Sequence, residues 1–339
     1  MTPTTIKQTA TAITDNSRRF DWQKLLAPAV LVVLYAFFAV FGRNFFTVDA
    51  VLNILNASYF IGFMAIGTTF VIITGGIDLS LGTTMICAAL LGAMARSSWG
   101  WPMWAGLCLA VFVGLVIGFI NGILVAYLKL PPFIATLGTQ MMGMGFGAIV
   151  TKVMTMRYPT YGSPDGLFKY IFYKSSATST LPGFPVGAVW LAIAFVIAWV
   201  VLNRTKFGRY TYAMGSNYEA TRLSGVKTKR YLTLVYAVCG LFCGFAAIFY
   251  GAVYTTIIPS TGNGLELLGI AGVVIGGTSM SGGMGTLMGT LIGVFVMSVL
   301  KQGLMLMGLQ PHWQTFFTGV VVVGAVLLDN YRVSRMNRV

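Results

Sequence analysis

The chain has 339 residues, of which 57% are apolar and only 9% are charged, against roughly 25% charged residues in soluble domains. Apolar runs long enough to cross a bilayer recur from residue 25 to residue 328, and none alternates as a β-barrel strand would. The net charge of +14 comes from basic residues between these runs and at the chain ends, where topology signals are expected, so nucleic-acid binding is not indicated. The sequence therefore predicts an all-α polytopic membrane protein.

The first 24 residues are polar, and no apolar core follows early enough for a cleaved secretory signal. We therefore expect residues 1–24 to form a cytoplasmic tail before an uncleaved first helix. About ten transmembrane helices are expected, at residues 25–42, 51–75, 79–96, 103–128, 133–152, 185–203, 231–255, 264–278, 284–308 and 312–329.

Basic residues predict the orientation of these helices. They crowd the segment 204–230 and lie at both ends of the chain, so all three are expected on the cytoplasmic side. Residues 25–331 then form one transmembrane domain, with a cytoplasmic tail at 332–339. The segment 153–184 carries three basic residues, yet the count of helices places it outside. Its many Tyr, Pro, Gly and Ser residues suit a folded external loop.

Two glycine-rich segments interrupt the apolar pattern. They read GGIDLSLG at 75–82 and IGGTSMSGGMG at 275–285, and both contain too much glycine for an unbroken helix. Irregular backbone is tolerated at membrane depth only where it is buried in protein or lines a wet cavity. We therefore expect broken or re-entrant segments at both places.

Two acids lie at the expected helix starts. Asp78 follows the first Gly-Gly pair and is expected to cap a helix that begins at Leu79. Glu266 follows TGNG and lies where a helix dipole favours negative charge. An acid inside the membrane is costly, so contact with a polar solute, or proton coupling, is the alternative to capping for each.

Neutral polar residues on the apolar runs are candidates for a solute path, although hydrogen bonds between helices use the same chemistry. The candidate substrate-path residues, with the two acids, are Asp78, Asn56, Asn121, Thr136, Gln140 and Glu266.

No motif for catalysis or nucleotide binding is present. The sequence has no Walker A pattern, no HExxH and no nucleophile elbow, so it is not expected to be an enzyme. His312 is the only histidine, which gives no basis for a metal site, and all four cysteines lie in apolar runs. We expect no cofactor in this chain.

The centre of the 204–230 segment, SNYEATRLSGV, predicts a short helix. Ser216 or Asn217 would cap it, Glu219 lies in its first turn, and Gly225 would end it. Such a helix at the membrane surface could be held by a partner protein. A solvated basic loop is the alternative.

Several long motifs in order resemble the ribose/galactose-type permeases of bacterial ABC importers, from about residue 44 to residue 331. They are GGIDLSLG, NGILVAYLKLPPFIATLGT, FGRYTYAMGSNYEATRLSGV and GNGLELLGIAGVVIGGTSMSGG. Tyr218 departs from the small or acidic residue that the family would have there, and 153–184 is not clearly family-like.

The resemblance implies a multi-pass subunit of the bacterial inner membrane that moves a monosaccharide such as ribose. It implies a second permease copy (the same or a related chain), a periplasmic sugar-binding protein and a separate ATP-binding subunit that holds ATP and Mg. Contact with that subunit would fall on Asn217, Glu219, Ala220, Arg222, Leu223, Gly225 and Val226. Two alternatives stay open: an ion-coupled secondary transporter with Asp78 and Glu266 as relay, and an ABC permease for another small polar solute such as branched-chain amino acids.

Overall fold

The computed structural model describes residues 23–42, 44–174 and 183–336, so most of the predicted N-terminal tail and the last three residues lie outside the described residues. Most of the described residues are helical, and very few are in strands. In order, its elements are α2 (Gln23–Phe41), α3 (Val48–Ile73), α4 (Leu81–Ser97), α5 (Met103–Ala126), α6 (Pro132–Val150), β1 (Met156–Arg157), α7 (Leu167–Phe172), α8 (Val186–Arg204), α9 (Lys206–Ser216), α10 (Tyr218–Leu223), α11 (Thr228–Tyr254), β2 (Thr256–Ile257), α12 (Leu265–Ile275), α13 (Leu287–Leu306) and α14 (Pro311–Met336).

The prediction of an all-α membrane protein is confirmed. Within the described residues, seven helices are long and apolar enough to cross a membrane, and three further apolar helices are shorter. Helices occupy all ten of the predicted segments. The largest difference is at the end, where α14 continues to Met336 and so takes in the start of the predicted C-terminal tail.

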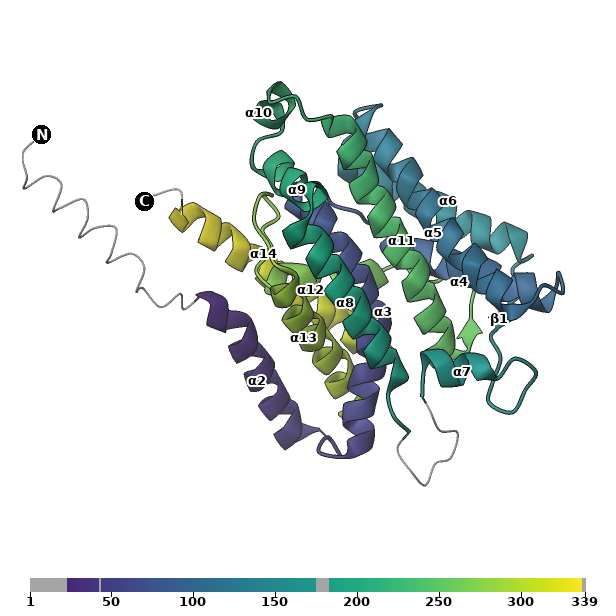
Figure 1. Ribbon diagram of the computed structural model, residues 1–339. Coiled ribbons are helices and arrows are strands. Elements are labelled where there is room, and N and C mark those ends of the chain that lie inside the picture. Colours follow the sequence, from purple (N-terminus) through teal and green to yellow (C-terminus); the bar gives the residue numbers. More distant parts are fainter. Residues whose placement is uncertain (1–22, 43, 175–182, 337–339) are drawn as a thin grey trace, which may run out of the picture.

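The helices form one bundle with α3 in its centre. Most of α3 is buried, including the large side chains of Tyr59 and Phe60. Figure 1 shows α10 and α7 at opposite ends of the bundle, with α11 running between them. We refer to these as the α10 end and the α7 end.

Glycines allow α5 and α11 to pack with their backbones in contact. A Cβ added at Gly118 would lie 2.8 Å from the Cα of Gly240, and one at Gly122 would lie 2.7 Å from the Cα of Thr233. Helices in lipid associate through this kind of close packing, because burial of apolar surface gives little advantage there. The glycine-rich composition of the spans is therefore largely a packing feature at this pair.

One short antiparallel pair of strands closes the α7 end. β1 follows α6 and β2 follows α11, with Met156 opposite Ile257 and Arg157 opposite Thr256. The pair fixes where the chain leaves α11 and turns back toward α12.

Candidate functional site

The first glycine-rich segment is a chain break between α3 and α4. Asp78 lies in it and is only 2% exposed. Its Oδ1 accepts the Ser80 main-chain N–H at 2.9 Å and the Ser80 hydroxyl at 2.6 Å. The helix begins at Leu81 with Ser80 at the N-cap, so the prediction of a helix from Leu79 capped by Asp78 is off by two residues. Asp78 instead fixes the turn that leads into the helix.

Residues of α5 and α6 complete a network around this break. Asn121 donates to the Ser80 hydroxyl at 2.9 Å and lies 3.5 Å from the second carboxylate oxygen of Asp78. The Thr139 hydroxyl donates to Asn121 at 2.6 Å, and Thr136 accepts the Leu79 N–H at 3.1 Å. The network ties the break to two neighbouring helices, and all of its polar side chains are buried.

Glu266 organises a second polar cluster at the start of α12. Its Oε1 accepts the Gly264 N–H at 2.9 Å and lies 3.3 Å from the side-chain nitrogen of Gln140. The same nitrogen donates to Asn263 at 3.0 Å. The Oε2 is buried without a hydrogen-bond partner among the described residues, and faces Gly82 in the first turn of α4. Glu266 therefore caps its own helix start, as one of the two interpretations expected.

The structure brings five of the six candidate path residues into these two clusters, around the start of α4. The sixth, Asn56, lies apart near the α7 end, where its amide donates to the Tyr173 hydroxyl at 3.3 Å. All six are at most 5% exposed within this chain. Asn263 is the exposed member of the second cluster, and the sequence analysis did not single it out. The sequence signal that could have identified Asn263 is its position in TGNG, a polar segment between two apolar runs.

The second glycine-rich segment, 276–286, is a break between α12 and α13. Its Gly283 N–H donates to the Ile73 carbonyl at the end of α3 at 2.8 Å, and its Gly285 carbonyl accepts the Tyr212 hydroxyl of α9 at 2.8 Å. Asp329 of α14 accepts the Ser279 hydroxyl at 3.2 Å and the Met280 N–H at 3.0 Å. Three helices therefore hold this break.

The predicted short helix of the 204–230 segment is confirmed as α10. Asn217 is its N-cap and accepts the Ala220 N–H at 2.9 Å, while Gly225, with a φ of +84°, ends the turn that follows. Glu219 and Arg222 form an ion pair at 2.6 Å on its surface, and Leu223 is 81% exposed. The preceding helix α9, which the sequence analysis did not predict, carries α10 away from the bundle.

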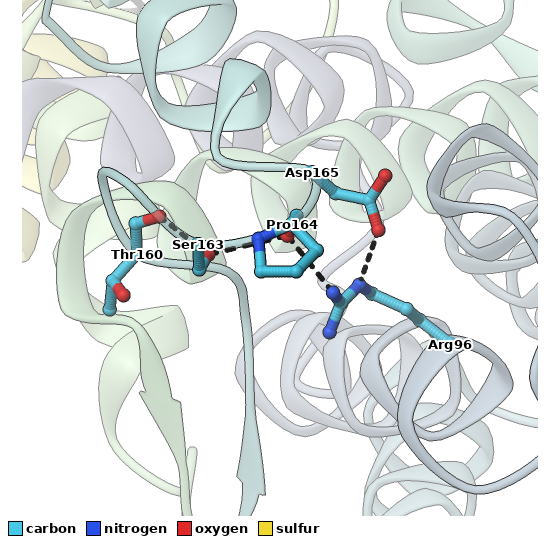
Figure 2. A network of polar contacts seen from close by, with 5 residues as sticks. All are labelled: Arg96, Thr160, Ser163, Pro164 and Asp165. Atoms are coloured by element: carbon cyan, nitrogen blue, oxygen red, sulfur yellow. Dashed lines mark hydrogen bonds and ion pairs between the residues drawn. The ribbon is translucent and has the colours of Figure 1, made fainter.

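Polar contacts also order the α7 end. Figure 2 shows Arg96, at the end of α4, donating to Asp165 at 2.8 Å and to the Pro164 carbonyl at 3.0 Å. The Ser163 hydroxyl donates to the Thr160 carbonyl at 2.6 Å. Together these bonds shape the loop between β1 and α7. The loop borders an open pocket that also includes Arg157 and Thr255.

Lys169 anchors α7 against the end of α11. Its Nζ donates to the Thr255 hydroxyl at 2.5 Å and lies over the rings of Tyr161 and Tyr173, 5.7 and 5.4 Å from their centroids. Thr255 has a φ of +64°, an uncommon conformation for a residue with a side chain. Burial lowers the pKa of Lys169, because water is removed from the charged form.

Comparisons with known proteins cover nearly the whole chain. Residues 50–326 match the family described as "Branched-chain amino acid transport system / permease component". The chain is 38% identical over 309 residues to the ribose import permease protein of Escherichia coli (strain K12), covering 88% of this chain and 91% of that one. It is 38% identical over 312 residues to the ribose import permease protein of Bacillus subtilis (strain 168), covering 91% and 92%. It is 32% identical over 306 residues to the fructose import permease protein of Rhizobium meliloti, covering 90% and 84%. No solved structure matches.

Proposed function

The chain belongs to the family of branched-chain amino acid transport system permease components, and we propose that it is the sugar permease subunit of a bacterial ABC importer. It is a multi-pass protein of the inner membrane that translocates a monosaccharide. It is a transport subunit and not an enzyme, so ATP hydrolysis belongs to a separate partner. The observation that carries this function is the 38% identity with two ribose import permeases along about nine-tenths of the chain.

The chemistry of the interior favours a neutral cargo over an amino acid. Asp78 and Glu266 are only 2% and 4% exposed, so neither carboxylate reaches a surface at which a zwitterion could pair with it, even though the Glu266 Oε2 accepts no hydrogen bond from the described residues. A zwitterion entering the membrane would need such charge complementarity. Hydroxyl-rich solutes need only neutral donors and acceptors.

For the topology, ten membrane helices are proposed: the seven long ones and the three shorter apolar ones. The positive-inside rule supports a cytoplasmic α10 end, because 204–230 is strongly basic. Both chain termini would then be cytoplasmic, and 153–184 would lie on the periplasmic side.

Three partners belong to this proposal, and the topology suggests where they bind. The ATP-binding subunit would dock on α10 and its flanks, through the surface that Asn217, Glu219, Ala220, Arg222, Leu223, Gly225 and Val226 supply. The exposed Leu223 supports this, since an apolar side chain that is 81% exposed can insert into a pocket of the partner. The periplasmic sugar-binding protein would dock at the α7 end, and a second permease copy, the same chain or a related one, would complete the path.

The six candidate path residues take a supporting part in this proposal. Asp78, Asn121, Thr136, Gln140 and Glu266 hold the start of α4 and the start of α12 in place, and Asn56 holds α7. They position the segments that line the path and do not line it themselves, because each is buried within its own chain.

The test is ATPase activity in proteoliposomes that contain this chain, a ribose-type ATPase subunit and a binding protein loaded with one sugar at a time. Stimulation by one loaded sugar is the expected result and identifies the cargo. Stimulation by branched-chain amino acids instead would support the function that the family description names. Uptake that persists without ATP and collapses with an uncoupler would support the ion-coupled transporter.

A further inference from the structure

The segment 258–264 between β2 and α12 enters the membrane from the α7 end. It joins the strand pair at that end to α12, which has only 11 residues. A helix of this length spans about 16 Å, roughly half of a 30 Å hydrocarbon core. The other end of α12 leads into the second break, which contacts α9 at the α10 end. Gly264 therefore lies near the middle of the membrane, and the segment before it is the non-helical half of a crossing that α12 completes.

This non-helical segment exposes polar groups at membrane depth. Ser260, Thr261 and Asn263 all have exposed side chains. Their main-chain N–H groups donate no hydrogen bond to any other described residue. Unsatisfied backbone at this depth is not tolerated against lipid, because each group would cost several kcal/mol there. The surface of 260–263 must therefore meet water, a hydrated solute or polar groups of a second permease copy, and not lipid.

Buried residues of α4, α6 and α12 hold the segment 260–263 in place. Gln140 of α6 donates to Asn263 and also contacts Glu266, which caps α12. Gly262 packs on the first turn of α4, where a Cβ added to it would lie 2.7 Å from the Gly82 carbonyl. This support fixes Asn263 while leaving its amide nitrogen and the nearby N–H groups available.

We infer that the exposed face of Ser260, Thr261 and Asn263 is part of the wall of the sugar path, and that Asn263 binds sugar hydroxyls there. The inference rests on the proposed function. It names neutral donors and acceptors, which match an uncharged polyol. It also explains why the buried candidate residues cluster here: they position a segment that the solute touches.

Cysteine accessibility tests the wet surface. Cys108 is exposed whereas Cys87, Cys239 and Cys243 are buried, so Cys108→Ser provides a background with little labelling. Into it we would introduce Asn263→Cys or, as a control, Val196→Cys on the apolar α8, a position 57% exposed. A charged, membrane-impermeant thiosulfonate should modify Asn263→Cys at least about tenfold faster, because thiols react as thiolates in water. Modification should also block uptake.

Equal labelling of the two positions, in an importer that still takes up sugar, would overturn the inference. So would modification that leaves uptake unchanged. Failure of the proposed function has a different signature, namely a complex without sugar uptake before any reagent is added.

Substitution tests the binding role of Asn263. Asn263→Leu should raise the KM for uptake by about tenfold, the loss expected for one or two neutral hydrogen bonds, and Asn263→Gln should restore part of it. Asn203→Leu on α8 is the matched control, because among the described residues the Asn203 amide donates only to the Trp199 carbonyl of its own helix. An unchanged KM in Asn263→Leu would contradict the binding role.

Discussion

The two glycine-rich breaks have similar sequences but are held in different ways. The break at 74–80 is fixed by side chains: Asp78, Asn121 and Thr139 form a buried network that leads from α4 through α5 to α6. The break at 276–286 is fixed from several helices at once, by main-chain contacts with Ile73 and Gly215 and by the side chains of Tyr212 and Asp329, which bond mostly to its main chain. Glycine content thus marks where a membrane helix is interrupted, whereas the neighbouring elements decide whether the break is an internal anchor or a contact for α9.

A large effect is expected at the second break, where its backbone touches that of α9. A Cβ added at Gly215 would overlap the Ile73 carbonyl oxygen. Gly215→Ala should therefore shift the backbone, lower the stability by about 1–3 kcal/mol and strongly reduce uptake. Thermal unfolding in detergent measures the loss of stability, and transport assays in proteoliposomes measure the loss of uptake. Gly138→Ala is the control for stability, because its added Cβ meets nothing within 4 Å. Equal melting of both variants would show that α9 does not depend on this contact.

At the first break, the strongest test is Asp78→Leu. It removes the acceptor of the Ser80 N–H and hydroxyl, and each buried group left unpaired costs about 1–3 kcal/mol. We expect a poor yield of folded protein by size-exclusion chromatography. Asp78→Asn keeps an acceptor for Ser80 and should express normally with reduced uptake. Full uptake in Asp78→Asn would mean that the charge plays no part in shaping the path.

A smaller and more local effect is expected from Asp329→Ala. The change frees the Ser279 hydroxyl and the Met280 N–H, so the second break should loosen by about 1–2 kcal/mol. Hydrogen exchange at residues 279–283 should become faster, while exchange at 78–82 stays unchanged. Asp329→Asn keeps an acceptor, so its exchange rate at residues 279–283 should lie between those of the wild type and Asp329→Ala. Faster exchange at both breaks would show that they open as one unit.

The smallest effect is expected from Thr139→Val, at the far end of the first network. It removes the donor to the side-chain Oδ1 of Asn121 and nearly preserves the side-chain shape, so the free energy of unfolding should fall by about 1 kcal/mol. Thr139→Ser keeps the donor and serves as the control in thermal unfolding. A stability loss as large as that of Asp78→Leu would mean that the network acts as an indivisible unit.

Local patterns predicted the helices well. The apolar runs located a helix in each predicted segment, and seven of these helices are long and apolar enough to cross a membrane. The capping residue, first-turn acid and glycine of 216–226 located α10, because each of these signals acts within a few residues. The partners of Asp78 were not predictable, since Asn121 lies 43 residues further along the chain and only packing brings it near. The same holds for Asn263 and Gln140, 123 residues apart.

The sequence separation of these partners has a consequence for how the protein is made. Chains enter the membrane during synthesis, from the N-terminus onward. When α3 and α4 are inserted, Asp78 has only Ser80 beside it, and Asn121 and Thr139 reach it with the next helical hairpin. Glu266 is in the opposite position, because Gln140 and Gly82 are already in place when α12 is synthesised. The Asp78 carboxylate is therefore inserted before most of its hydrogen-bond partners, whereas the Glu266 carboxylate is inserted after its partners are in place.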